Sequence, residues 1–179
     1  MTYVALLRGI NVGGKNKVDM KQLKAVFEDE GMTSVRTYIN SGNVIFDSTV
    51  RSTTRLTQLL EKAIAKRFGF NVAVLLRDLK SMRTLVKAIP SRWTDDKAMR
   101  CYVMFLWADV ARPSVLKQLQ HKPELDDVLY AWGSIVWRVD RKHITRSGMT
   151  KLLVTPLYKR MTIRSVNTTR KLLELMEAS

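Results

Sequence analysis

Hydrophobic residues in the first half of the chain alternate between two spacings. Runs of consecutive apolar residues predict strands, whereas stretches with an apolar stripe at i, i+3 and i+4 predict helices that bury one face. Asp19 and Asp78 occupy N-cap positions, and Gly31, Gly69 and Pro90 stand where helices should end. The predicted order of elements is β-α-β-β-α-β, which is that of the split ferredoxin-like unit. One further helix follows it. The predicted strands are residues 3–7, 35–39, 44–46 and 72–76.

The second half repeats this order at an offset of roughly 95 residues. Its predicted elements are a strand at 102–107, a helix at 113–120, a hairpin at 128–139, and helices near Ser147, from Thr155-Pro156 and over 168–177. We therefore predict an α+β fold of two duplicated ferredoxin-like (β-α-β-β-α-β) halves with antiparallel sheets and a C-terminal helical extension. Residues 1–90 form the first half with its trailing helix, and residues 91–179 form the second half with basic C-terminal helices.

Composition indicates a self-sufficient globular protein. With 46% hydrophobic residues among 179, the chain can build a substantial core without disulfides. Cys101 is the single cysteine and lies in an apolar run, so we expect a buried, inert thiol. No stretch is long and apolar enough to span a membrane, and the N-terminus lacks the features of a signal peptide. We expect a cytoplasmic protein without a membrane partner.

The charge of the chain is strongly positive and unevenly placed. The formal net charge is +15, from 31 basic and 16 acidic residues. Residues 141–173 hold nine basic residues and no acidic one, and the first 18 residues add Arg8, Lys15 and Lys17, also without an acid. Such segments favour a polyanion or a phosphorylated ligand as partner, and a solvated basic surface that keeps the protein soluble explains the charge equally well.

The stretch from Gly9 to Asn16, GINVGGKN, nearly matches a P-loop. Its glycines and lysine agree with the pattern, but Asn16 stands where a Ser or Thr hydroxyl should hold magnesium. A separate helix cap at Asp19 and the β-β hairpin that follows the helix also argue against a nucleotide hydrolase. Two interpretations stay open: the amides of Gly13 and Gly14 with Lys15 cradle one anionic group, or the glycines only make a turn.

A second polar cluster, Asn40-Ser41-Gly42-Asn43, joins two predicted strands. A hairpin turn explains these residues well, because Gly and Asn tolerate positive φ. Ligand binding by Ser41 and Asn43 would require a neighbouring loop. We expect the loop after the first strand to lie at the opposite end of the sheet, so that a joint site would need the second half of the chain.

Near the C-terminus, Thr162, Arg164, Asn167 and Thr168 form a dense set of donors next to a helix start. This set suits phosphate or carboxylate binding through a bidentate arginine and backbone amides. Simple helix capping explains it equally.

Catalytic and metal chemistry receive little support. Ser147 and Lys151 are one helical turn apart, so a Ser-Lys nucleophile pair is conceivable, but a cap at Ser147 with Lys151 in solvent is simpler. The two histidines lie far apart and no cluster has metal-ligand spacing, so we expect no metal and no cofactor. The acidic residues at 28–30 and 126–127 are interpreted as solvated surface. The chain has four tryptophans: Trp93, Trp107, Trp132 and Trp137. We interpret them as side chains that pack in the core or in hairpins rather than as base-stacking platforms.

Four segments have a distinctive sequence: LLRGINVGGKNKVDMKQLKAVFEDEG, VRTYINSGNVIF, SGMTKLL and MTIRSVNTTRKL. Together they resemble a widespread bacterial family known as domain of unknown function 1697, over nearly the whole chain. The resemblance implies a duplicated ferredoxin-like fold and no established activity. In the family pattern an Asn and an aromatic residue follow the arginine, whereas this chain has Ser165 and Val166, which puts in doubt any recognition by amide or stacking there. The positions that match the family motifs are Arg8, Gly9, Asn11, Gly13, Gly14, Met20, Thr37, Tyr38, Ser41, Gly42, Asn43, Lys151, Thr162, Arg164, Asn167 and Thr168.

Two functional hypotheses follow. The first is a basic binding module for nucleic acid or another phosphate-bearing ligand, held mainly by the C-terminal Lys and Arg residues, and it predicts strong salt dependence. The second is an enzyme acting on a small phosphorylated or nucleotide-like substrate in a cleft between the halves, with Lys15 at the anion and Arg164 or Lys151 in support. A scaffold for an acidic protein partner fits the charge as well. The lack of an acid-base constellation favours binding, and the catalytic residues and oligomeric state stay open. The predicted ligand-binding residues are Arg8, Asn11, Gly13, Gly14, Lys15, Ser41, Asn43, Lys151, Thr162, Arg164, Asn167 and Thr168.

Overall fold

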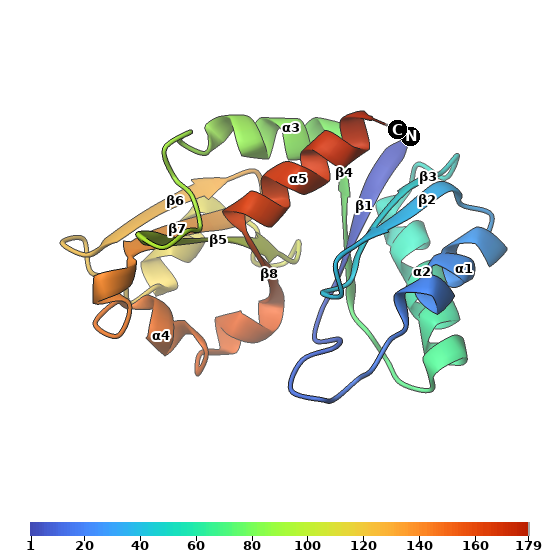
Figure 1. Cartoon of the computed structure of the whole chain (residues 1–179), viewed down its shortest axis with the longest axis horizontal. Coiled ribbons are helices and arrows are strands. Elements are labelled where there is room, and N and C mark those ends of the chain that lie inside the picture. Colours follow the sequence, from blue (N-terminus) through green and yellow to red (C-terminus); the bar gives the residue numbers. More distant parts are fainter. Residues whose placement is uncertain (179) are drawn as a thin grey trace. The chain divides into compact units, whose positions relative to one another are not determined.

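Two four-stranded antiparallel sheets, each with its own helices, make up the structure (Figure 1). The computed structural model describes residues 1–178, and η marks a 3₁₀ helix. The first half contains β1 (Thr2–Leu7), α1 (Met20–Asp29), β2 (Thr33–Tyr38), β3 (Asn43–Asp47), α2 (Thr53–Phe68), β4 (Val74–Asp78) and α3 (Leu79–Ala88). The second half contains β5 (Met99–Leu106), η1 (Pro113–Gln118), β6 (Asp126–Ala131), β7 (Ser134–Asp140), η2 (Arg141–His143), α4 (Met149–Leu152), η3 (Pro156–Arg160), β8 (Met161–Ser165) and α5 (Val166–Glu177).

The chain divides into two compact units. Unit 1 comprises Met1–Met82 together with the chain from Leu172 onward, and unit 2 comprises Arg83–Lys171. The sequence-based boundary near residue 90 therefore falls eight residues later than the boundary in the structure. The last turn of α5 belongs to unit 1, where Arg36 Nη2 donates a hydrogen bond of 2.6 Å to the carbonyl of Leu175. An arginine is favourable at a helix C-terminus, because the helix dipole places partial negative charge there.

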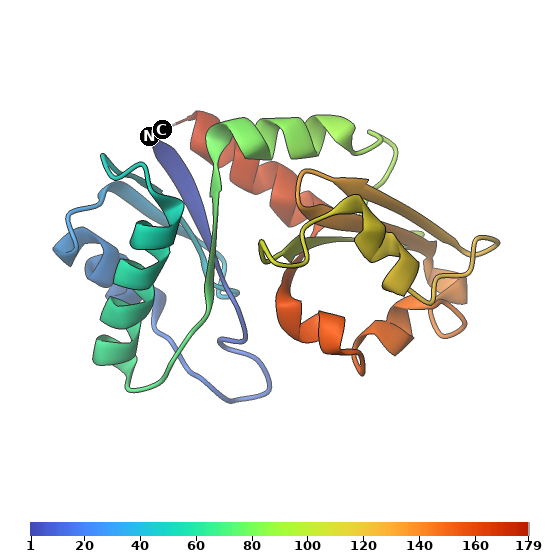
Figure 2. The same ribbon diagram turned by 180° about the vertical axis from the view of Figure 1, so that it is seen from behind.

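The sheet of unit 1 has the strand order β2-β3-β1-β4 expected of a ferredoxin-like fold. In register, Val4 of the central strand β1 lies opposite Ile45 of β3 and Arg77 of β4. Helices α1 and α2 lie on the same face of this sheet (Figure 2), and their apolar stripes fill the core around Phe46. The ring of Phe27 meets Phe46 edge-on, with centroids 5.2 Å apart. The helix positions predicted from spacing are confirmed.

The sheet of unit 2 has the order β6-β7-β5-β8, which repeats the first sheet strand for strand. One hydrogen bond recurs at the end of each central strand: Leu7 N donates to Gly42 O over 2.8 Å, and Leu106 N donates to Gly133 O over 3.0 Å. The duplicated α+β fold predicted from the order of elements is therefore confirmed.

Caps define the helix starts where the sequence predicts them. Asp19 accepts a hydrogen bond of 2.9 Å from Gln22 N, and Asp78 accepts one of 2.7 Å from Ser81 N. Ser52 caps α2 in the same way, and Gly69 ends that helix in the left-handed conformation with φ of 78°.

Unit 2 departs from the prediction at its short elements. The two segments that open with proline, η1 and η3, are 3₁₀ helices, and α4 is a single turn. Strand β8 pairs with β5 as an edge strand and is not predicted from the sequence. In β8, apolar Met161 and Ile163 alternate with polar Thr162 and Arg164. Two apolar residues are too few to predict a strand, and the hydrogen-bond donors between them look like those of a ligand-binding loop.

Candidate functional site

The glycine-rich loop after β1 forms a small hairpin of its own. Val12 and Lys15 pair as an isolated antiparallel bridge, and Lys15 N donates to Val12 O over 3.1 Å. Gly13 and Gly14 have φ of 58° and 75°, which glycine adopts without the strain of a side chain. The Lys15 amide is thus used inside the turn, so the turn interpretation of the two glycines accounts for this geometry.

Asn11 fastens this loop to the β2–β3 hairpin. Its Nδ2 donates to Val18 O over 3.0 Å and to Asn40 O over 2.9 Å, and its Oδ1 accepts from Val18 N over 2.8 Å. The expectation that the two loops lie at opposite ends of the sheet is therefore wrong. Strands β1 and β2 are both antiparallel to β3, so they run in the same direction and their ends meet at one edge. We call residues 8–18 and 39–42 the loop pair.

Ser41 and Asn43 hold the hairpin closed. Asn43 is fully buried, and its Nδ2 donates to Tyr38 O over 3.0 Å and to Ser41 Oγ over 2.9 Å. Between them, Gly42 packs so closely that a Cβ there would lie 2.7 Å from Leu7 Cβ. These contacts give both polar residues a structural role.

The loop pair exposes positively charged side chains and two aliphatic side chains to solvent. Lys15 and Lys17 are exposed and pair with no carboxylate among residues 1–178, while Arg8 is partly exposed. Val12 is 68% exposed and Ile39 is 50% exposed. Positive charge beside exposed apolar surface is typical of a docking surface.

Arg164 and Thr162 lie inside unit 2 rather than on its surface. Arg164 is only 7% exposed, and its Nη1 donates to Thr162 Oγ1 over 3.0 Å and to Ile163 O over 2.8 Å. Burial lowers the pKa of Arg164 to about 10, because the charged form is poorly solvated there. A soluble polyanion does not reach this side chain without a change in the fold.

Thr168 takes part in capping, whereas Asn167 bonds to the segment before β5. Ser165 precedes α5, and its Oγ accepts from Thr168 N over 3.1 Å. Asn167 Nδ2 donates to Asp95 O over 2.8 Å, and Asp95 N donates to Asn167 Oδ1 over 3.3 Å. Capping accounts for the contact of Thr168, and the two bonds to Asp95 give Asn167 a structural role of a different kind.

Asp126 and Ser147 form a buried polar centre in unit 2. The Ser147 hydroxyl donates to Asp126, which also accepts from Lys122 N over 2.8 Å and from Gly148 N over 3.0 Å. Asp126 is only 4% exposed, so its interpretation as solvated surface is wrong. Burial alone would raise the pKa of Asp126, but the hydrogen bonds from Ser147 and the two amides outweigh it and lower that pKa. Lys151 is exposed and makes no bond to Ser147, which leaves the Ser-Lys nucleophile without support.

Residues 141–160, which we call the basic segment, present free positive charge. Two of its arginines are engaged: Arg141 contacts Asp95 and Asp96, and Arg160 pairs with Asp109. Farther along, Arg170 Nη1 donates to the carbonyl of Trp93 over 2.7 Å. Four cations of the basic segment are exposed and pair with no carboxylate within the described chain, residues 1–178: Lys142, Arg146, Lys151 and Lys159.

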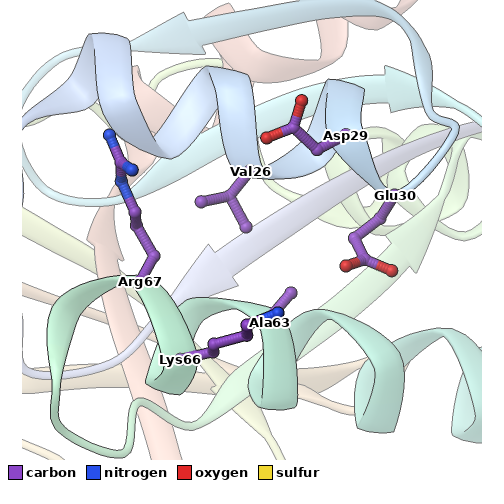
Figure 3. Close-up of a pocket in the computed structure, with 6 residues that line it drawn as sticks. All are labelled: Val26, Asp29, Glu30, Ala63, Lys66 and Arg67. Atoms are coloured by element: carbon purple, nitrogen blue, oxygen red, sulfur yellow. The ribbon is translucent and has the colours of Figure 1, made fainter.

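A groove of about 370 Å³ lies between α1 and α2 in unit 1 (Figure 3). Asp29 and Glu30 line it from α1, and Lys66 and Arg67 line it from α2. Its two acids and two bases balance, so the groove has no net attraction for an anion.

Metal-binding groups do not gather in the described chain. Among residues 1–178, no three His, Cys, Asp or Glu side chains are placed to hold an ion, and no helix there is long and apolar enough to cross a membrane. Cys101 is fully buried, and burial raises the pKa of its thiol to about 12. The prediction of a buried thiol is confirmed, and its inertness stays a prediction that the raised pKa supports.

Comparison with known proteins supports the motif resemblance. A family model described as "Protein of unknown function (DUF1697)" matches residues 1–137. The chain belongs to this family. A solved structure, that of the conserved bacterial protein SP0830 from Streptococcus pneumoniae, is similar with a TM-score of 0.84 and 29% identity, over 98% of each chain. No curated protein matches. The DUF1697 match identifies the family without an activity, so function has to be argued from side chains.

One side chain of this DUF1697 protein is not where the sequence analysis expects it. Trp93 and Trp137 are buried as predicted, and Trp107 is partly buried, but Trp132 is 56% exposed at the tip of the β6–β7 hairpin. The sequence predicts a strand through Trp132 and a turn near Gly133-Ser134, whereas the turn in the structure is one residue earlier. A signal was available, because Trp132 directly precedes Gly133, and the tip of a two-residue turn projects into solvent.

Proposed function

We propose that this DUF1697 protein is a basic binding module for nucleic acid or another phosphate-bearing ligand. The observation that supports the proposal is the set of four exposed, unpaired cations in the basic segment, Lys142, Arg146, Lys151 and Lys159. Residues 141–160 contain no carboxylate, and none of these four cations pairs with a carboxylate elsewhere in residues 1–178. A polyanion that contacts these cations gains affinity by releasing its own counterions.

The other predicted ligand residues divide into two roles under this proposal. Arg8 and Lys15 in the loop pair assist with positive charge, as Lys151 does in the basic segment. The polar residues position backbone rather than contact the ligand: Asn11, Ser41, Asn43, Asn167 and Thr168 all bond to neighbouring backbone or side chains. Buried Thr162 and Arg164 stabilise the edge strand β8.

Fluorescence anisotropy of labelled single-stranded and double-stranded oligomers tests the proposal. The wild type is compared with a variant that carries Lys142→Gln, Arg146→Gln, Lys151→Gln and Lys159→Gln. All four side chains are exposed, so the substitutions should leave the fold intact. For single strands the slope of log K against log salt should fall by about 0.7 for each phosphate that the variant no longer neutralises, so by up to about 3 for all four.

A matched control removes the same charge elsewhere. Lys21, Arg55, Lys62 and Lys66 are exposed on α1 and α2 of unit 1, and their change to Gln also lowers the net charge from +15 to +11, since four cations are removed in each variant. We expect this control to bind nearly as the wild type does. Equal losses in both variants would mean that total charge alone attracts the oligomer, and no binding at about 50 mM salt would contradict the proposal outright.

A further inference from the structure

The β6–β7 hairpin displays a tryptophan in a strained backbone conformation. Trp132 has φ of 41° and Gly133 has φ of 69°, as a two-residue turn requires. Glycine or asparagine normally fills the first position of such a turn, because a bulky side chain is strained at positive φ. The side chain is nonetheless 56% exposed, so the strained position presents much of the ring to solvent. Strain at an exposed aromatic residue motivates the hypothesis that the ring has a use.

Unit 1 also has an exposed apolar residue with positive φ in the equivalent hairpin. Ile39, in the β2–β3 hairpin, has φ of 49° and is 50% exposed. Both halves thus place an apolar side chain at the tip in the left-handed region, but only unit 2 has an aromatic ring there. The difference provides a natural control for the role of the ring.

Three segments of unit 2 meet at the end of β5, next to Trp132. Leu106 N donates to Gly133 O over 3.0 Å on one side of β5, and Trp107 N donates to Arg160 O over 3.1 Å on the other. The hairpin tip, the loop that follows β5 and the end of η3 therefore lie along one edge of the sheet. We call this edge the β5 end, and its chain segments are residues 107–112, 131–134 and 156–160.

The β5 end is positively charged. Arg160 forms a two-point ion pair with Asp109, with contacts of 2.9 Å from Nε and 2.6 Å from Nη2. The hydrogen bond from Arg160 lowers the pKa of Asp109, and the charge of Arg112 adds to this effect. Arg112 and Lys159 are exposed and pair with no carboxylate in the described part of the chain, residues 1–178. These three segments hold three bases and a single acid, a net charge of +2 from 3 minus 1.

We propose that Trp132 is a base-stacking platform for single-stranded nucleic acid, with Arg112 and Lys159 contacting the phosphates beside it. The inference rests on the proposed function and names its ligand class. An exposed indole on the same sheet edge as two exposed cations suits a chain that alternates flat bases with phosphates. In a duplex the bases already stack on one another, so the ring has no free base to contact. Single strands are thus favoured over duplexes at this edge.

Anisotropy with a labelled single-stranded 12-mer and its duplex form tests the inference. We expect Trp132→Ala to weaken single-strand binding by about 5- to 150-fold with little change in the salt slope, because stacking releases no counterions. Trp132→Tyr should restore most of the affinity, since it keeps an aromatic face. Lys159→Gln should instead lower the salt slope by about 0.7.

Ile39→Ala is the control, because it shortens an exposed apolar residue at positive φ in the β2–β3 hairpin of unit 1, and it should bind the single strand as the wild type does. Circular dichroism of each variant checks that the fold is kept. If Trp132→Ala binds as tightly as the wild type while the four-residue variant of the basic segment loses binding, the stacking inference is overturned and the proposed function stands. If the wild type binds neither oligomer at about 50 mM salt, both are overturned.

Discussion

Replacing Gly42 by alanine should destabilise unit 1 more than any ordinary glycine substitution. Gly42 has φ of 76°, where a side chain costs about 1–2 kcal/mol. In addition, its Cβ would lie 2.7 Å from Leu7 Cβ and 2.8 Å from Ile10 Cδ1. The end of Ile10 can turn aside, but Leu7 Cβ is attached directly to the backbone of the central strand. Overpacking of this kind costs about 1–3 kcal/mol, so we expect a total loss of about 2–5 kcal/mol.

Gly69→Ala separates the two contributions. Gly69 has nearly the same backbone angle, φ of 78°, but no atom lies within 4 Å of its would-be Cβ. Its substitution should lose only the backbone part, about 1–2 kcal/mol. Urea unfolding followed by far-ultraviolet circular dichroism measures both variants, because all four tryptophans lie in unit 2 and their fluorescence does not report on unit 1 directly. If Gly42→Ala is no less stable than Gly69→Ala, the close packing of the hairpin on β1 is refuted.

Three further predictions concern single side chains. Asn11→Ala removes three hydrogen bonds and should speed hydrogen exchange at the Val18 amide. Asn16 has a similar backbone φ, and Asn16→Ala removes only one bond, to Gly9, so it should speed that exchange less. Equal effects of the two substitutions would contradict the fastening role of Asn11. Asp126→Asn should lower the free energy of unfolding by about 1–3 kcal/mol near pH 7. The folded-state pKa of Asp126 is lowered, so this stabilisation is fully present above the unfolded value of about 3.9 and disappears as the pH falls through the folded pKa. A difference from wild type that did not shrink as the pH falls below about 3.9 would count against the assignment. Cys101, with its pKa raised to about 12, should resist iodoacetamide at pH 8 until urea unfolds the chain, and rapid labelling of the native protein would show that the thiol is accessible.

Sequence patterns predict the fold well where an element buries one face. The stripes of α1 and α2 and the caps at Asp19 and Asp78 specify position and type together, because periodicity and capping chemistry agree. Strand β8 lacks that agreement. The residue type of Arg164 suggests a surface donor, and only the pairing of β8 with β5 shows that it is buried.

The candidate site was harder to predict because it depends on contacts between distant segments. The role of Asn11 in fastening the loop depends on its hydrogen bond to the carbonyl of Asn40, which is 29 positions away in the sequence. Asp126 looks like surface until Ser147 and Gly148 are brought to it. Exposure is easier to predict for lysine, which is rarely buried, and Lys142, Lys151 and Lys159 are all exposed.

The C-terminal end of α5 makes the completion of unit 1 depend on the last residues that are translated. Unit 1 is discontinuous: the segment from Leu172 onward, which bonds to Arg36, is translated only after all of Arg83–Lys171. Domains generally fold as their sequences leave the ribosome, N-terminal ones first. Here the first sheet can form early, but its Leu175 partner arrives after unit 2 has been made. The contact that completes unit 1 can therefore form only after the last residues of unit 2 have been made.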